Sequence, residues 1–344
     1  MIQNTKKRGR QTYLFENPPV IRSYASVAGP KEGEGPWKND FDLILPDYNY
    51  GEKTWEKAET KMLEQAVRMA LEKNNSTSAE TEIFLAGDLL NQIISSNFAA
   101  RQLQIPFLGI YGACSSMAES LLLGSMLIDG GFCSRIVSAV CSHHYTAQRQ
   151  YRFPVEQGVQ FPDYSQWTAT AAGAAVLEKA SDTMLLPALR ITSATVGRVI
   201  DRGQDDPANM GAAMAPAAVD TVKTHMADLG RKPEDYDLII TGDLGRVGQQ
   251  LAENLFEKEG LSFHSIYKDC GSLLYNMKQS DIHSGGSGCG CSAAVLCGPL
   301  LKQMEQGRYK KILFVPTGAL MSPLSGFQGE TIPAIAHALT IEMI

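Results

Sequence analysis

Short apolar runs alternate with amphipathic stretches along most of the chain, a pattern that predicts strands followed by helices. Residues 82–89 and 237–244 are both apolar runs that end in Gly-Asp-Leu. Such a run is typical of a buried parallel strand that turns tightly into a helix. Residues 54–73 predict an amphipathic helix, because the following side chains share one face: Trp55, Ala58, Met62, Ala66 and Met69. A counterpart helix is expected from about Pro216 to Leu229.

The same motifs occur twice, in the same order. The small-residue segment around Cys114 resembles the segment around Cys291, and each is followed by a helical stretch, a basic residue and an apolar run. Ile21-Arg22 with Gly29 likewise has an echo in Leu189-Arg190 with Gly197. Together with the two runs that end in Gly-Asp-Leu, these are three pairs of similar segments in the same order, which predicts a duplication. Strand–helix alternation within each copy predicts parallel sheets covered by helices.

The chain length also fits two units of ordinary domain size. Ser181, Asp182 and Pro187 interrupt the pattern between the two copies, as turn-forming residues do. We therefore place the halves at residues 1–182 and 183–344.

Charge and hydropathy narrow the possible functions. The formal net charge is -6, which argues against nucleic acid as a partner. The one basic cluster, residues 6–10, reads as a solvated segment or, alternatively, an anchor. No apolar stretch follows it before Pro18, and no run approaches the roughly 18 residues of a spanning helix. We expect a soluble chain without a signal peptide.

Seven cysteines are present, an odd number in a chain without secretory features, so reduced thiols are expected. Most of them read as small buried apolar side chains. Cys289-Gly290-Cys291 does not have zinc-ligand spacing, and no metal site is predicted.

Three segments resemble the thiolase-like superfamily. Residues 111–116, around Cys114, resemble the nucleophile turn of ketoacyl synthases and thiolases. Residues 167–177 resemble the small-residue strand that closes their first half, and residues 283–290 the His-plus-glycine turn of their second half. The resemblance implies an α/β thiolase-like fold, in which two duplicated halves form α-β-α-β-α layers. A homodimer paired through the edges of the first-half sheets is expected by analogy with that fold.

Two longer segments, residues 142–154 and 281–293, resemble the stage V sporulation protein AD family, and the similarity extends from about residue 12 to residue 344. The resemblance implies a non-catalytic protein that binds dipicolinic acid (pyridine-2,6-dicarboxylate), free or as its calcium chelate. It also implies a role in dipicolinate uptake into developing spores and in germination. Its implied place is peripheral, at the spore inner membrane, beside integral membrane proteins of the same operon.

Four residues are the candidate ligand-binding set: Cys114, His283, His144 and Asp243. Cys114 begins a helix, where backbone N–H groups would lower the pKa of a thiol. His283 lies in a Gly-rich turn and could donate to a carboxylate. His144 is favoured over His143, since adjacent side chains on an extended segment point opposite ways.

Asp243 falls where ketoacyl synthases carry a second pocket histidine. A carboxylate there would repel the enolate oxygen that develops during condensation, so the resemblance implies binding rather than condensation. No cofactor is predicted. The acidic loop with Asp201, Asp205 and Asp206 lacks EF-hand spacing, so calcium is expected to arrive already chelated by the ligand.

Two other functions stay open. Cys114 could be the nucleophile of an acyltransferase or ketoacyl-synthase-like condensing enzyme. Alternatively, the chain could be a scaffold that organises membrane partners and keeps the pocket as a relic. Cys114 could then be a small residue chosen for helix packing, and His283 a turn residue facing solvent.

Overall fold

The computed structural model describes residues 6–151, 161–181, 186–276, 278–279 and 281–344. The strands that build its two half-sheets are, in chain order, β3 (Val20–Ala28), β5 (Ile83–Gly87), β6 (Phe107–Gly109), β7 (Arg135–Ser142), β9 (Ala171–Glu178), β10 (Leu189–Thr195), β11 (Leu238–Thr241), β12 (Tyr267–Asp269), β14 (Lys311–Val315) and β17 (Ala338–Met343).

The two halves repeat one strand order. In the first half, β5 lies between parallel neighbours β6 and β7, and antiparallel β9 and β3 follow β7. In the second half, β11 lies between parallel β12 and β14, and antiparallel β17 and β10 follow β14. The half-sheets join where Val20 pairs with Arg190. β3 and β10 also each carry a register shift near their start.

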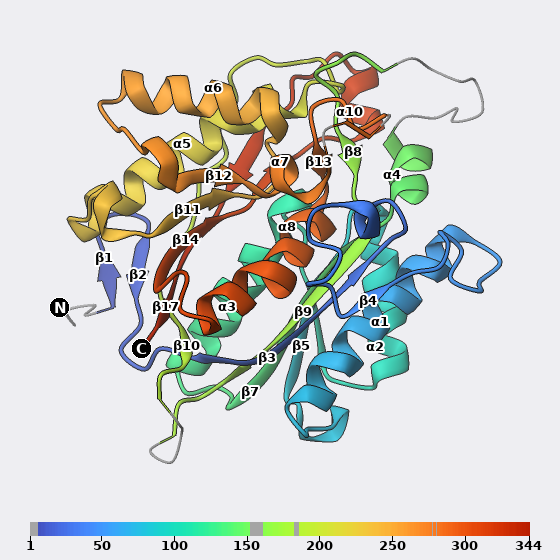
Figure 1. Cartoon of the computed structure of the whole chain (residues 1–344), viewed down its shortest axis with the longest axis vertical. Coiled ribbons are helices and arrows are strands. Elements are labelled where there is room, and N and C mark those ends of the chain that lie inside the picture. The colour runs from blue at the N-terminus through green and yellow to red at the C-terminus, as the bar shows by residue number, and fades with distance from the viewer. Residues whose placement is uncertain (1–5, 152–160, 182–185, 277, 280) are drawn as a thin grey trace.

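Helices cover both outer faces and fill the space between the half-sheets (Figure 1). The first half is covered by α1 (Trp55–Lys73) and α2 (Ile94–Leu103). The second is covered by α5 (Met210–Leu229) and α6 (Gly245–Lys258). Between them lie α3 (Ser116–Asp129) and α8 (Cys289–Val295).

Each strand contributes side chains to two cores, because successive side chains point to opposite faces of the sheet. On β7, Ile136 joins the central core while Val137 joins the core under α1 and α2. On β14, Ile312 joins the central core while Leu313 joins the core under α5 and α6. The α-β-α-β-α arrangement predicted from the sequence is therefore confirmed.

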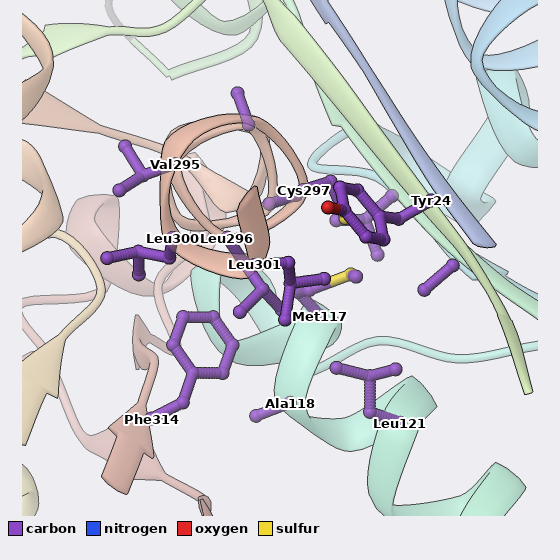
Figure 2. Packing of buried hydrophobic residues seen from close by; sticks show 14 of the residues in the cluster. Tyr24, Met117, Ala118, Leu121, Val295, Leu296, Cys297, Leu300, Leu301 and Phe314 are labelled. Atoms are coloured by element: carbon purple, nitrogen blue, oxygen red, sulfur yellow. The ribbon is translucent and has the colours of Figure 1, made fainter. Parts of the chain in front are cut away.

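The central core is formed by residues far apart in the sequence (Figure 2). Met117 and Leu121 of α3 pack in one cluster with Val295 of α8, Phe314 of β14 and Tyr24 of β3. Burying each apolar side chain of this size stabilises the fold by about 1.5–3 kcal/mol. All seven cysteines are free and buried, as the sequence predicted for most of them.

The predicted helix at residues 54–73 is confirmed as α1, with Thr54 as its N-cap. The predicted start of α5 at Pro216 is wrong, because the helix begins six residues earlier, at Met210. Asn209 caps it by accepting from the Ala212 amide, and Pro216 lies inside the helix. Proline removes one hydrogen bond from the helix because it lacks an N–H. Burial of the small residues before Pro216 compensates for this loss.

The proposed division at 182/183 falls on residues outside the described part of the chain, and it stays a prediction. No helix among the described residues is both long and apolar enough to cross a membrane.

Candidate functional site

A pocket opens beside Cys114, where the two halves meet. The space enclosed within it is about 40 Å³, and the volume rises to about 490 Å³ when the open space at its mouth is included. The walls are mainly apolar, with a few hydroxyl, thiol and amide groups. The lining residues are Leu89, Ala113, Cys114, Ala147, Gln148, Tyr151, Thr168, Pro207, Met210, Ser287, Ala319 and Met321.

A strained turn presents Cys114 to this pocket. Ala113 has a left-handed φ of 50°, and the short 3₁₀ helix Ala113–Ser115 leads directly into α3. The second half packs closely on this turn through β15 (Thr317–Ala319). A Cβ atom on Gly318 would lie 2.2 Å from the Gly112 carbonyl oxygen. Only glycine therefore lets β15 approach, and this approach brings the Thr317 hydroxyl within hydrogen-bond distance of Asp243.

Asp243 lies behind Cys114, at the end of β11, and is completely buried. Its carboxyl accepts hydrogen bonds from the Thr317 hydroxyl at 2.8 Å and from the Gly288 amide at 3.0 Å. Gly288 has a φ of 95°, which favours glycine. Burial raises the pKa of Asp243 to about 7, while its hydrogen bonds with Thr317 and Cys114 act in the opposite direction.

The expectation that the helix start lowers the pKa of Cys114 is wrong. Burial raises the pKa of this thiol well above its ordinary value, and the nearby carboxyl of Asp243 raises it further. The nearby Gly288 amide lowers it only in part. Cys114 is therefore a neutral thiol at physiological pH, and its one hydrogen can serve in a hydrogen bond.

His283 does not line the Cys114 pocket, contrary to the prediction. It lies in the predicted turn with a left-handed φ of 50°, and its backbone pairs with Gln166. Its Nδ1 lies 3.8 Å from a carboxylate oxygen of Asp163, and its side chain is 25% exposed. The turn thus directs the imidazole toward the surface rather than toward Cys114.

His144 also lies outside the pocket lining. It is the first residue of α4 (His144–Tyr151), and Ala147, Gln148 and Tyr151 of the same helix form one pocket wall. The His144 ring stacks on Trp167, with centroids 3.5 Å apart. His143 is held by the Tyr48 carbonyl oxygen at 2.8 Å, and burial lowers the pKa of His143 to about 4.

Of the four predicted site residues, the structure thus brings Cys114 and Asp243 together and separates both histidines from them. Sequence reasoning missed the polar lining residues Gln148, Tyr151, Thr168 and Ser287, although all four lie within the segments that carried the family resemblance. It also missed two methionines of the second half, Met210 and Met321, for which the sequence gives no distinguishing signal.

Carboxylates of the acidic loop accept hydrogen bonds from protein groups. Asp201 accepts from the Thr331 hydroxyl and the Gly203 amide, and Asp206 accepts from the Tyr164 hydroxyl. Within the described ranges, no group of three or more His, Cys, Asp or Glu residues is arranged to hold a metal ion.

Comparison with known proteins decides the family. The model of the family "Stage V sporulation protein AD" matches residues 9–342. The stage V sporulation protein AD of Bacillus subtilis (strain 168) is 45% identical over 337 residues, which covers 98% of each chain. The chain belongs to the stage V sporulation protein AD family.

Solved structures place this family member in the thiolase-like fold. The 3-oxoacyl-[acyl-carrier-protein] synthase III of Aquifex aeolicus VF5 is similar with a TM-score of 0.56 and 14% identity, covering 94% of this chain and 99% of that one. A variant of OleA from Xanthomonas campestris gives a TM-score of 0.60 and 13% identity, with 96% and 99% covered. At these identities the likeness concerns the fold alone.

Proposed function

We propose that this sporulation protein is a non-catalytic binding protein for pyridine-2,6-dicarboxylate, free or as its calcium chelate, and that it acts in the uptake of this ligand into the developing spore. The observation that carries the proposal is the contact between Cys114 and Asp243. A thiol reacts as its thiolate, whereas burial, and after it the neighbouring carboxyl of Asp243, raise the pKa of Cys114 and keep the proton on its sulfur.

The lining of the pocket supports a small planar ligand. Apolar side chains such as Leu89 and Met210 can contact the faces of an aromatic ring. The Gln148 amide, the Ser287 hydroxyl and the Cys114 thiol can donate to carboxylate oxygens at its edge.

Titration calorimetry with dipicolinate, with and without calcium, tests the proposal. Saturable heat for one site per chain is the expected result. Absence of binding at millimolar ligand would overturn it. The calcium arm shows whether the chelate binds, because within the described chain there is no cluster that would hold calcium alone.

The second candidate is an acyltransferase or condensing enzyme that uses Cys114. It is favoured by the position of this thiol in the short 3₁₀ helix that leads into α3, in a fold shared with a 3-oxoacyl-[acyl-carrier-protein] synthase. Incubation with acyl-CoA of several chain lengths should then add an acyl mass to the Cys114 peptide. Under the scaffold alternative, substitution of Cys114 would leave function in cells unchanged.

The proposal includes a homodimer and a peripheral place at the spore inner membrane, beside integral membrane proteins of the same operon. The edge strand β6 supports the dimer, since its only strand partner among the described residues is β5. Leu108 on β6 is 50% exposed, and Phe98 on the adjacent α2 is also exposed. A second copy that pairs with β6 would cover both side chains.

A further inference from the structure

We propose that Asp243 makes the pocket take up a proton together with an anionic ligand, so that Asp243 determines the charge state in which the pocket accepts a dicarboxylate. This inference rests on the proposed function and concerns the same pocket. Its basis is the arrangement of hydrogen-bond donors around Asp243.

The Asp243 carboxyl accepts hydrogen bonds from the Thr317 hydroxyl at 2.8 Å and the Gly288 amide at 3.0 Å, and the Cys114 thiol is its charge-sensitive neighbour on the pocket side. A thiol has a single hydrogen. While Asp243 is ionised, its negative charge attracts that hydrogen, and the sulfur then presents lone pairs to the pocket. A dianion in the pocket then meets a sulfur acceptor with a buried negative charge directly behind it.

Protonation of Asp243 reverses this arrangement. The carboxyl O–H can donate to the Cys114 sulfur, and the S–H is released to donate to a ligand oxygen. The buried negative charge disappears at the same time. Because like charges in a buried site repel strongly, an anionic ligand binds the protonated form in preference, and binding draws in the missing proton.

The surroundings keep this proton within reach of neutral pH. The titratable groups that face Asp243 are all acids: Asp269 at the end of β12, Cys114 at the start of α3, Cys289 and Cys291 on α8, and Cys270. Asp269 accepts from the Leu244 and Gly245 amides and does not touch the pocket. Burial among these acids places the pKa of Asp243 at about 7.

The decisive measurement is proton uptake by the wild-type protein. Dipicolinate is titrated calorimetrically at pH 7.5 in two buffers of different ionisation enthalpy, and the difference in apparent heat gives the protons taken up per ligand. We expect roughly 0.5 to 1 proton. The affinity should be nearly constant from pH 6 to 7 and then fall by up to about tenfold per pH unit.

Two variants locate the proton. Asp243→Asn should bring the uptake close to zero and make the affinity independent of pH. Glu32→Gln is the matched control: Glu32 is also completely buried, and burial raises its pKa to about 7. Its hydrogen-bond partners Thr170 and Tyr275 do not line the pocket, whereas Cys114, the neighbour of Asp243, does. Proton uptake by Glu32→Gln should equal that of the wild type.

The outcomes separate this inference from the function on which it rests. Wild-type binding without proton uptake would overturn the inference and leave the binding function standing, and so would equal uptake by Asp243→Asn. A wild type that gives no dipicolinate heat at pH 6 would overturn the binding function, and the inference with it.

Discussion

Asp243 and Cys114 come from opposite halves of the chain and are neighbours behind the pocket, where the negative charge of Asp243 adds to the effect of burial in raising the pKa of the Cys114 thiol. Gly318 makes this contact possible, because it allows β15 to pack on the Gly112 carbonyl and to bring Thr317 against Asp243. Burial and the charge of Asp243 therefore both hold the proton on the Cys114 sulfur.

The pair predicts an unreactive Cys114. At pH 8 the wild-type thiol should be alkylated slowly by iodoacetamide, because burial and Asp243 both raise the pKa of Cys114 and only the thiolate reacts. Asp243→Asn removes the negative charge and should increase the rate by about tenfold, equivalent to one pKa unit. The rate is measured by mass spectrometry of the Cys114 peptide.

Cys133 serves as the internal control in the same digest, since Asp243 is not among the groups that raise its pKa. Its labelling rate should be the same in both proteins. A wild-type Cys114 that labels as fast as a free thiol would contradict the assignment.

The buried carboxyl also predicts how stability depends on pH. The folded-state pKa of Asp243 is raised from 3.8 to about 7. Between pH 4 and pH 7 the folded chain therefore binds more protons than the unfolded chain. Wild-type stability should then fall relative to Asp243→Asn as pH rises from about 4 to 7, and the difference should be constant above that. The full change is on the order of 4 kcal/mol.

Urea unfolding at several pH values measures this difference. Asp205→Asn, at an exposed position in the acidic loop, should give a nearly flat difference against the wild type. A flat curve for Asp243→Asn would show that Asp243 is ionised throughout and that its burial is relieved in solution.

Much of the fold could be predicted because similar segments occur twice, in the same order, along the sequence. The echoes around Cys114 and Cys291 mark equivalent layers, and the alternation of Ile136 with Val137 places them on opposite sheet faces. Pro216 misled the prediction of α5, since proline is a strong local stop signal, whereas burial of the small residues before it is a tertiary effect.

The site was predicted only in part, for a geometric reason. Asp243 ends a predicted strand and Cys114 begins a predicted helix, and the structure brings the two residues together where the halves join. The direction of His283 depends on a left-handed backbone in a turn, which the sequence does not reveal for a residue other than glycine. Met210 and Met321 reach the pocket only through the packing of loops.

Gly318 is expected to be essential for assembly of the halves. Gly318→Ala would place a Cβ atom 2.2 Å from the Gly112 carbonyl oxygen, and since both partners are backbone, the strand must shift. We expect a loss of about 1–3 kcal/mol in the free energy of unfolding, as for overpacked cores. Gly326→Ala is the control, because a Cβ there meets nothing within 4 Å. Equal stability of the two variants would rule out the close approach.

The proposed homodimer predicts a sensitive position on β6. Leu108→Glu would place two like charges across the paired edge strands and should shift the protein to monomer in sedimentation velocity. Leu324→Glu, at an exposed apolar residue on α10 (Pro323–Phe327), should leave the dimer intact. A wild type that sediments as a monomer would refute the dimer, and a dimeric Leu108→Glu variant would exclude β6 as its interface.

The last prediction sets the pocket seen in the structure against the one expected from the sequence. Gln148 lines the pocket with an amide that can donate to a carboxylate, whereas His283 points toward Asp163 at the surface. Gln148→Ala should therefore weaken dipicolinate binding by about tenfold, the effect of losing one hydrogen bond to a charged group. His283→Ala should leave the affinity within about twofold of the wild type. The reverse result would move the ligand away from Cys114 to the surface beside the Gly-rich turn, because the imidazole at residue 283 cannot contact a ligand that Gln148 holds unless the turn rearranges.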